Sequence, residues 1–288
     1  MQCKRDDEES RRAYWSEQMD TAGDFMRVML DYPVEECGEP LVSLEELAKS
    51  AGVTVGFSRT RIAGTYDRLF YLREGPAQDF VAVAAEMNNR GWILKVEDGF
   101  RSRAMQKYIA LQENVLDVIL RRVIWEGKGQ TPTPDFMFRR MTVLTATCPK
   151  IGTHMSGSAI DISVLSAEDH SELDRGGPYL ELSELTPMAS PFISAEATVN
   201  RTEITDLMRR HGFMAYPYEF WHYSKGDAYA EYLMKSGAPA RYGPVDFDLS
   251  AGTVAPIANP ETSLHTLADI EENIKQALGR LGKERDVE

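Results

Sequence analysis

The segment from His154 to Val164 constrains the fold most, because it places an aspartate inside a strand that must be buried. Side chains of a strand alternate between its two faces. One face carries Ile160, Ile162 and Val164, and the other carries Ala159, Asp161 and Ser163. An ionised carboxylate beside a core strand is costly unless a positive group compensates it, and a metal ion can do so. The segment therefore predicts a sheet with one apolar face and one face that carries a polar site.

A second segment, Glu219 to His222, adds an imidazole and a carboxylate three residues apart. Two imidazoles and one carboxylate, from His154, Asp161 and His222, are a preferred ligand set for zinc, and they leave a fourth position for water, as catalytic zinc sites require. Taken singly, each residue has a plainer interpretation: Asp161 could bond a nearby backbone amide, and His154 could be an ordinary loop histidine. The remaining histidines, His170, His211 and His265, are expected to be surface or capping residues.

Glu219 is the candidate general base. Zinc lowers the pKa of a bound water toward 7, but attack on a peptide also needs a base that accepts the water proton and returns it to the leaving amine. On a regular strand Glu219 and His222 would face opposite ways, and Pro217 disfavours a helix. We therefore expect a bend or bulge that brings both side chains to the metal.

These motifs resemble the zinc D-alanyl-D-alanine dipeptidases of vancomycin-resistance type, within the wider group that includes D,D-carboxypeptidases. The resemblance covers roughly residues 60–235. It rests on Asp98-Gly99-Phe100-Arg101, on His154 to Asp161, and on Gly212-Phe213 leading into Tyr216 and Glu219-Phe220-Trp221-His222-Tyr223. The likeness implies one zinc ion held by His154, Asp161 and His222, a catalytic glutamate at Glu219 and an oxyanion-stabilising arginine at Arg101. The plainer alternative for Arg101 is a salt bridge with Glu97 or Asp98.

Two departures from the family pattern concern specificity. The family usually has a serine two positions before the first histidine, where this chain has Gly152 followed by Thr153, so a hydroxyl is lost at that position. The dipeptidases also carry an acidic residue that receives the free amine of the substrate. At that place this chain aligns Leu180, with Glu181 adjacent. Recognition of an amine is therefore expected to differ.

Charge and cysteine content exclude several classes of protein. The 45 acidic and 32 basic residues give a net charge of -13, which repels nucleic acid and anionic membranes. The cysteines, Cys3, Cys37 and Cys148, are odd in number and lack metal-binding spacing, so we expect free thiols. The N-terminus lacks the apolar core of a secretory signal, and no run is long enough for a membrane span, which favours a cytoplasmic protein.

Periodicity predicts an α+β fold with a central, mainly antiparallel sheet that bears the zinc site and is flanked by helices. Expected helices cover 10–31, 43–52, 76–89, 102–125, 200–211 and 267–281, expected strands cover 92–96 and 158–164, and 142–147 is β-prone. We divide the chain into an N-terminal helical extension (1–59), a zinc peptidase core (60–236), and a linker with an amphipathic C-terminal helix (237–288). That helix could cover the core or mediate homo-oligomerisation.

The predicted function is zinc-dependent hydrolysis of a small peptide that contains D-amino acids, with D-Ala-D-Ala as the first candidate substrate. One alternative is a D,D- or L,D-carboxypeptidase that acts on cell-wall stem peptides. Another is a non-catalytic, zinc-stabilised binding module, against which the presence of both Glu219 and Arg101 argues.

Overall fold

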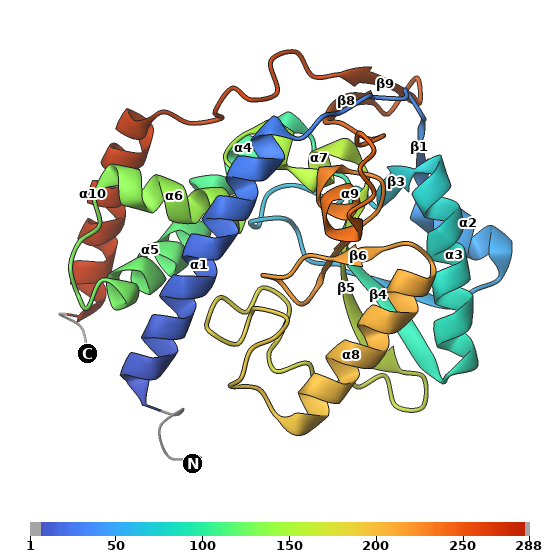
Figure 1. Cartoon of the computed structure of the whole chain (residues 1–288), viewed down its shortest axis with the longest axis horizontal. Coiled ribbons are helices and arrows are strands. Elements are labelled where there is room, and N and C mark those ends of the chain that lie inside the picture. Colours follow the sequence, from blue (N-terminus) through green and yellow to red (C-terminus); the bar gives the residue numbers. More distant parts are fainter. Residues whose placement is uncertain (1–6, 286–288) are drawn as a thin grey trace.

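A computed structural model describes residues 7–285 of the chain, and the side chains of residues 7–282 (Figure 1). The helices are α1 (Glu8–Asp31), α2 (Leu44–Ala51), α3 (Glu74–Asn89), α4 (Arg103–Ala110), α5 (Glu113–Glu126), α6 (Pro134–Thr145), α7 (Thr153–Ser156), α8 (Ala195–Arg210), α9 (Ala228–Met234) and α10 (Leu267–Arg285), with a short 3₁₀ turn η1 (Pro149–Ile151). The strands are β1 (Leu41–Ser43), β2 (Val55–Phe57), β3 (Tyr71–Arg73), β4 (Trp92–Asp98), β5 (Ala159–Ser166), β6 (Met214–Ala215), β7 (His222–Ser224), β8 (Val245–Asp248) and β9 (Thr253–Pro256).

Five strands form the central sheet in the order β2-β4-β5-β7-β6. The β2 and β4 pair is parallel, whereas β4 with β5, β5 with β7, and β6 with β7 are antiparallel. The predicted α+β class with a mainly antiparallel central sheet is therefore confirmed. The division of the chain into three parts stays a prediction, and β2, inside the segment 1–59, is a strand of this sheet.

One face of the sheet packs on helices, as the alternation along β5 predicts. Ile160, Ile162 and Val164 are fully buried there. They share a core with residues of α2, α3 and α8, among them Leu44, Phe80, Met87, Ile204 and Leu207. This leaves the opposite side of β5, with Asp161, for the polar site.

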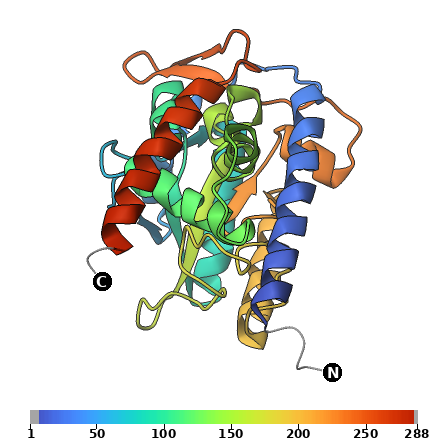
Figure 2. The same cartoon turned by 90° about the vertical axis from the view of Figure 1, so that its left-hand side faces the viewer.

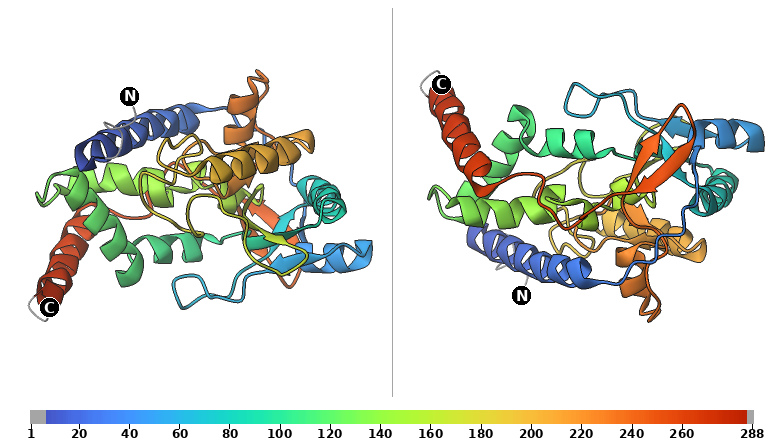
Figure 3. Two further views of the ribbon diagram at one scale, coloured as in Figure 1. Left: turned by 90° about the horizontal axis from the view of Figure 1, so that it is seen from below. Right: turned by 90° about the horizontal axis from the view of Figure 1, so that it is seen from above.

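The remaining long helices gather at one end of the molecule. α6 lies between α1 and α10 (Figures 2 and 3). The apolar stripe of α10, which includes Ile270, Ile274 and Ala277, packs on α5 and α6. This helix was expected either to cover the core or to mediate homo-oligomerisation, and in the structure it covers α5 and α6 of its own chain. The homo-oligomer stays a prediction.

The helix predicted over 102–125 is wrong as a single element. The chain leaves the helical conformation before α5, and Gln112, whose ψ is 139°, is the N-cap of that helix. No Gly or Pro marks the break, so tertiary packing has overridden local propensity. The two halves pack on different clusters: Met105 and Ile109 of α4 contact Ile62, whereas α5 packs with α6 and α10.

The β-prone segment 142–147 is another correction, because residues up to Thr145 belong to α6. Thr133 caps this helix by accepting a hydrogen bond from the Phe136 amide, and Pro134 occupies its first turn. The threonine hydroxyls inside the helix bond back to carbonyls one turn earlier, Thr142 to Phe138 and Thr145 to Met141. Burial of Met137 and Met141 thus outweighs the strand preference of threonine.

The cysteines and the absence of a membrane span among the described residues agree with the sequence. Cys37 and Cys148 are free thiols, as expected, and Cys3 lies outside the described residues. Among residues 7–285, no helix has the length and apolarity required to cross a bilayer.

Candidate metal centre

The register of the central sheet places three polar side chains in a row. Asp161 of β5 lies opposite His222 of β7 on one side and opposite Asp98 of β4 on the other. Directly opposite residues on adjacent strands have Cβ atoms about 5 Å apart. In β4 the register shifts between Val96 and Asp98, so Glu97 is an extra residue. This bulge moves Asp98 onto the face that carries Asp161.

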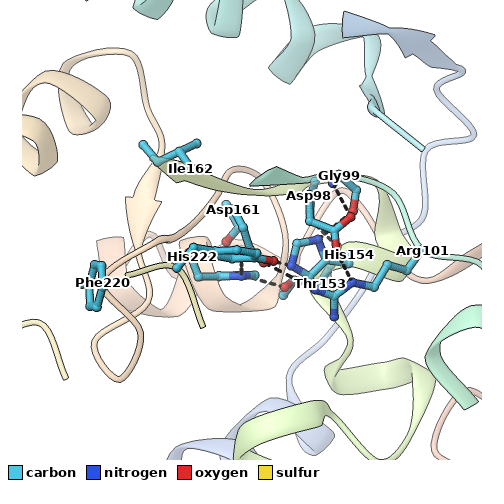
Figure 4. Close-up of polar contacts among 12 residues, drawn as sticks. Asp98, Gly99, Arg101, Thr153, His154, Asp161, Ile162, Phe220 and His222 are labelled. Atoms are coloured by element: carbon cyan, nitrogen blue, oxygen red, sulfur yellow. Dashed lines mark hydrogen bonds and ion pairs between the residues drawn. The ribbon is translucent and has the colours of Figure 1, made fainter. Parts of the chain in front are cut away.

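His154 reaches the same place from α7, just before β5. Gly157 ends this short helix with a φ of 69°, a left-handed conformation that glycine adopts without steric cost. A Cβ atom at Gly157 would lie 2.2 Å from Leu41 Cδ2, so the Leu41 side chain would have to move to admit any other residue. The turn therefore allows His154 and Asp161 to face each other although the chain reverses between them (Figure 4).

Both predicted histidine ligands approach the same carboxylate oxygen of the third ligand, Asp161. His154 Nε2 lies 3.2 Å from Asp161 Oδ1, and His222 Nδ1 lies 2.9 Å from the same oxygen. All three ligand atoms lie within 4.8 Å of one another, and the residues are buried. Ligand atoms of a tetrahedral zinc site, each about 2.0–2.1 Å from the ion, are about 3.3 Å apart. The donor set and its spacing therefore fit a zinc ion.

Each histidine is fixed by a hydrogen bond at its other ring nitrogen. His154 Nδ1 lies 2.7 Å from the Gly99 carbonyl oxygen, which can only accept, so this nitrogen carries the proton. His222 Nε2 lies 2.9 Å from Thr153 Oγ1. Such partners fix the orientation and the tautomer of metal-binding histidines. The nitrogens that face Asp161 are the ones left for a metal.

The second oxygen of Asp161 is held by two other side chains. The Tyr179 hydroxyl donates to Asp161 Oδ2 at 2.9 Å, and Arg101 Nη2 lies 3.4 Å from that oxygen. Burial raises the pKa of Tyr179 well above its usual value, so the phenol stays a donor. Burial also acts to raise the pKa of Asp161, but His154 and His222 more than offset it and keep this carboxylate ionised.

Arg101 lies beside the predicted ligands and also forms the ion pair with Asp98 that was its plainer alternative. Its Nε donates to Asp98 Oδ2 at 2.8 Å, and Arg68 Nη1 lies 3.1 Å from the same oxygen. Burial opposes the charge of Arg101, yet the Asp98 and Asp161 carboxylates raise the pKa of its guanidinium. Arg101 is therefore a permanent, oriented cation beside the three candidate ligands.

Glu219 lies in a turn between β6 and β7, as the expected bend requires. The Tyr216 amide donates to the His222 carbonyl at 2.9 Å, and the His222 amide donates to the Glu219 carbonyl at 3.3 Å. Burial raises the pKa of the Glu219 carboxyl to about 7, an effect that His222 partly offsets. A carboxyl with this pKa can exchange a proton near neutral pH.

All five predicted residues line one cavity of about 320 Å³. It lies between the polar face of the sheet and helices α4 to α6. Ala63, Ala146 and Leu180 also line it, and each has φ in the left-handed region, at 47°, 52° and 66°. Such backbone costs about 1–2 kcal/mol per residue and persists at functional sites, where the surrounding structure imposes it.

Sequence reasoning missed several supporting residues. Thr153, Tyr179 and Arg68 carry no motif signal that assigns their contacts. Two buried arginines support the turn that bears Glu219: Arg175 and Arg201 lie 4.9 Å and 4.2 Å from the centre of the Phe220 ring. Arg201 also donates to the Arg175 carbonyl at 2.7 Å. Only the fold reveals these contacts, because the partners are distant in sequence.

The other histidines lie outside the site, as expected. His211 Nε2 lies 2.8 Å from Glu86 Oε2, and His265 Nε2 lies 2.8 Å from the Lys107 carbonyl oxygen. His170 is exposed. None of the three lines the cavity.

A mixed sheet that carries a buried cluster of two histidines and an aspartate, beside a glutamate and an arginine, is the arrangement expected of a metallopeptidase, and the comparisons with known proteins support this class. A family model described as D-ala-D-ala dipeptidase matches residues 55–236, and the chain belongs to this family. A D-alanyl-D-alanine dipeptidase from Enterococcus faecium is 24% identical over 172 residues, which cover 58% of this chain and 75% of the relative. A D-alanyl-D-alanine dipeptidase from Synechocystis sp. is 24% identical over 223 residues, 70% of this chain and 88% of the relative.

Solved structures in the comparison are more distant. The LdcB LD-carboxypeptidase has a TM-score of 0.37 and 18% identity, over 72% of this chain and 78% of that chain. VanY, a vancomycin-resistance D,D-pentapeptidase solved with Zn(II), has a TM-score of 0.34 and 16% identity, over 65% of this chain and 95% of that chain.

Proposed function

We propose that this metallopeptidase uses a single zinc ion to hydrolyse a short peptide of the D-Ala-D-Ala type. In this proposal His154, Asp161 and His222 hold the zinc, Glu219 is the general base, and Arg101 stabilises the oxyanion. The observation that carries the proposal is the convergence of three buried ligand side chains at a cavity that Glu219 and Arg101 also line. A site that only stabilised the fold would be expected to use four protein ligands and to be closed.

The three ligands supply one negative charge, from Asp161. A bound zinc ion would supply a Lewis acid that lowers the pKa of water and polarises the substrate carbonyl. The surrounding contacts favour zinc retention, since Gly99, Thr153 and Tyr179 each fix one ligand. Rigid ligands lose little conformational freedom on binding, and partners of this kind typically contribute about 10–100-fold to metal affinity.

Glu219 would move the proton in the reaction. Its carboxylate accepts a proton from the attacking water while the new bond to the carbonyl carbon forms. It then delivers that proton to the amide nitrogen as the peptide bond breaks, so one proton is carried from water to the leaving amine. A pKa raised by burial suits both steps, and the positive charge of a bound metal would lower it again.

Arg101 would stabilise negative charge on the carbonyl oxygen. Its guanidinium is held by Asp98 at 2.8 Å, so it is oriented before substrate enters. A preorganised donor of this kind is typically worth about 3 kcal/mol in the transition state. The ion pair with Asp98 and the catalytic role are thus compatible, since one guanidinium has five N–H donors.

The test is metal analysis of purified protein followed by incubation with D-Ala-D-Ala. We expect about one zinc per chain, hydrolysis with the zinc-loaded protein, and loss of hydrolysis after chelation and dialysis, with recovery on adding zinc back. L-Ala-L-Ala serves as the matched control for chirality. Protein that binds no divalent ion, or that cleaves no peptide with zinc bound, would contradict the proposal.

A carboxypeptidase acting on stem peptides is the second candidate, and Leu180 favours it. In the dipeptidases the aligned position carries the acidic residue that binds the substrate amine. In this chain Leu180, whose side chain is 57% exposed, lines the cavity at that position. A stem peptide has no free amine beside the scissile bond. Release of D-Ala from a stem pentapeptide, with D-Ala-D-Ala left intact, would select this candidate.

A further inference from the structure

We infer that the substrate carries a bulky apolar acyl group on its amine, so that an N-acylated D,D-dipeptide is preferred to a free one. The inference rests on the proposed function and deepens it. It follows from three features of the cavity: its size, the apolar character of its helical wall, and the engagement of every carboxylate that lines it.

The cavity is large for a free dipeptide of alanine. Its volume of about 320 Å³ is roughly twice that of an engineered apolar cavity of about 150 Å³ that accommodates a benzene ring. The volume therefore leaves space for an apolar group in addition to the two residues around the scissile bond. Sites that enclose larger organic ligands begin at about 300 Å³.

The wall formed by helices α4, α5 and α6 is mostly apolar. Its apolar members are Ile109, Val115, Val118, Ile119, Val143 and Leu144, and its polar members are Gln106, Asn114 and Thr145. Two cavity residues are exposed large hydrophobics, Val118 at 50% and Leu180 at 57%. Exposed apolar side chains that continue an apolar cavity wall mark a binding surface, and burying them yields roughly 25 cal/mol per Å² of apolar surface. An apolar acyl group would gain this energy, whereas a free alanine dipeptide would not.

The acidic groups give an ammonium no free partner. Among the described residues, the carboxylates that line the cavity are Asp98, Asp161 and Glu219. Asp98 pairs with Arg68 at 3.1 Å and with Arg101 at 2.8 Å. The charge of this carboxylate is therefore already balanced by two guanidiniums and is not free for an ammonium. The proposed mechanism uses Asp161 and Glu219.

The charges of the cavity lead to the same conclusion. Its three carboxylates face two guanidiniums, Arg68 and Arg101, and a bound zinc ion would add two positive charges. The loaded site is then net positive, which repels an ammonium and attracts the free carboxylate at the other end of the substrate. Acylation removes the ammonium charge, so an acylated dipeptide avoids both the repulsion and the cost of burying an unpaired cation.

Binding to a protein that cannot turn over substrate tests the inference separately from hydrolysis. Zinc-loaded Glu219→Gln is titrated with D-Ala-D-Ala, N-acetyl-D-Ala-D-Ala and N-hexanoyl-D-Ala-D-Ala by calorimetry. We expect the hexanoyl compound to bind at least tenfold more tightly than the free dipeptide, with the acetyl compound between them. Equal or tighter binding of the free dipeptide would overturn the inference, even if the wild-type protein cleaves it.

Leu180 offers a matched pair of variants in the same background. Leu180→Asp restores a carboxylate at the rim, and Leu180→Asn has nearly the same shape without the charge. Both residues tolerate the φ of 66° better than leucine does, so the backbone is not strained by the change. We expect the preference for the hexanoyl over the free dipeptide to fall at least tenfold further in Leu180→Asp than in Leu180→Asn. The same fall in both variants would contradict the electrostatic argument.

The apolar wall is tested with two exposed valines. Val118→Ser removes apolar surface from the cavity rim, and Val199→Ser makes the same change on α8, away from the cavity, at a similar exposure of 54% against 50%. Valine to serine removes two methyl groups, and because Val118 is half-exposed these are together worth about one fully buried methylene, about 0.8 kcal/mol or about fourfold in affinity. We expect hexanoyl binding to weaken by about that factor in Val118→Ser and to be unchanged in Val199→Ser. Unchanged binding in both would overturn the role of the wall. Failure of the wild-type protein to cleave any of the three peptides would instead count against the proposed function.

Discussion

The two sides of the cavity are built differently. On the sheet side, polar side chains are fixed by named hydrogen bonds, as with His154 to Gly99 and His222 to Thr153. On the helical side, α4 to α6 present apolar side chains such as Val118 and Val143, which no polar contact orients. Chemistry needs atoms held within a fraction of an ångström, whereas apolar recognition needs surface area and volume. In the proposed function the sheet would therefore carry the reaction and the helices would carry selectivity.

Replacing Glu219 is expected to have the largest effect on the chemistry of the sheet side. In Glu219→Gln the carboxylate that would accept the water proton is lost, and general bases contribute about 10²–10⁴-fold to rate. We expect kcat to fall at least about a hundredfold with the zinc content unchanged, measured by D-Ala release and metal analysis. Activity equal to wild type would remove Glu219 from the mechanism.

A cavity-creating change in the helical layer should affect stability and leave the chemistry intact. Met141 of α6 is fully buried in the cluster shared with α5 and α10. Truncating such a residue to alanine costs about 2–5 kcal/mol. We expect Met141→Ala to lower the free energy of unfolding by this amount in denaturant titrations.

The activity of this variant separates the two sides of the cavity. Hydrolysis per zinc-loaded, folded molecule should stay within a few-fold of wild type, because Met141 lines neither the cavity nor the metal site. A loss as large as that expected for Glu219→Gln would show that the helical layer also positions the reacting groups.

The sheet side was easier to predict from the sequence than the helical side. Alternation along Ile160, Asp161 and Ile162 defines both faces of a strand, and the strand fixes what lies opposite. The break at Gln112 and the helical state of Thr142 depend instead on packing between distant segments, which local sequence does not encode. The contacts of Thr153 and Tyr179 were missed for the same reason, since each bonds a partner brought close only by folding.

The hydroxyl of Thr153 is expected to have a smaller effect, on the sheet side of the cavity alone. Thr153→Val keeps the shape of the side chain but removes the oxygen that lies 2.9 Å from His222 Nε2. Partners of metal-binding histidines typically contribute about 10–100-fold to metal affinity. We expect zinc affinity to fall by such a factor in competition with a chelator. Thr142→Val, which removes a hydroxyl from the helical layer, is the control and should bind zinc as wild type does.

The smallest expected effect is a pH dependence of stability in the zinc-free protein. Burial raises the pKa of Glu219 to about 7 from its usual value of 4.5, so the folded protein holds this proton at a pH where the unfolded chain has lost it. The stabilisation linked to the proton is complete below the unfolded pKa and is lost as pH rises through the folded one. A glutamine at this position does not titrate, so the stability of zinc-free Glu219→Gln does not fall in this way as the pH rises. Its Tm should match wild type near pH 4 and exceed it by a few degrees near pH 8.

Glu86 provides a control of opposite sign on the surface. Hydrogen bonds from His211 and Arg210 lower the pKa of Glu86 to about 2, so its contribution to stability is present above the unfolded pKa and is lost on acidification. Glu86→Gln should therefore lower the Tm slightly at neutral pH, since exposed ion pairs are worth at most about 1 kcal/mol. If Glu219→Gln also lowered the Tm of zinc-free protein at neutral pH, then Glu219 would be a stabilising ionised group. The sheet side would then not hold a carboxyl kept protonated by burial.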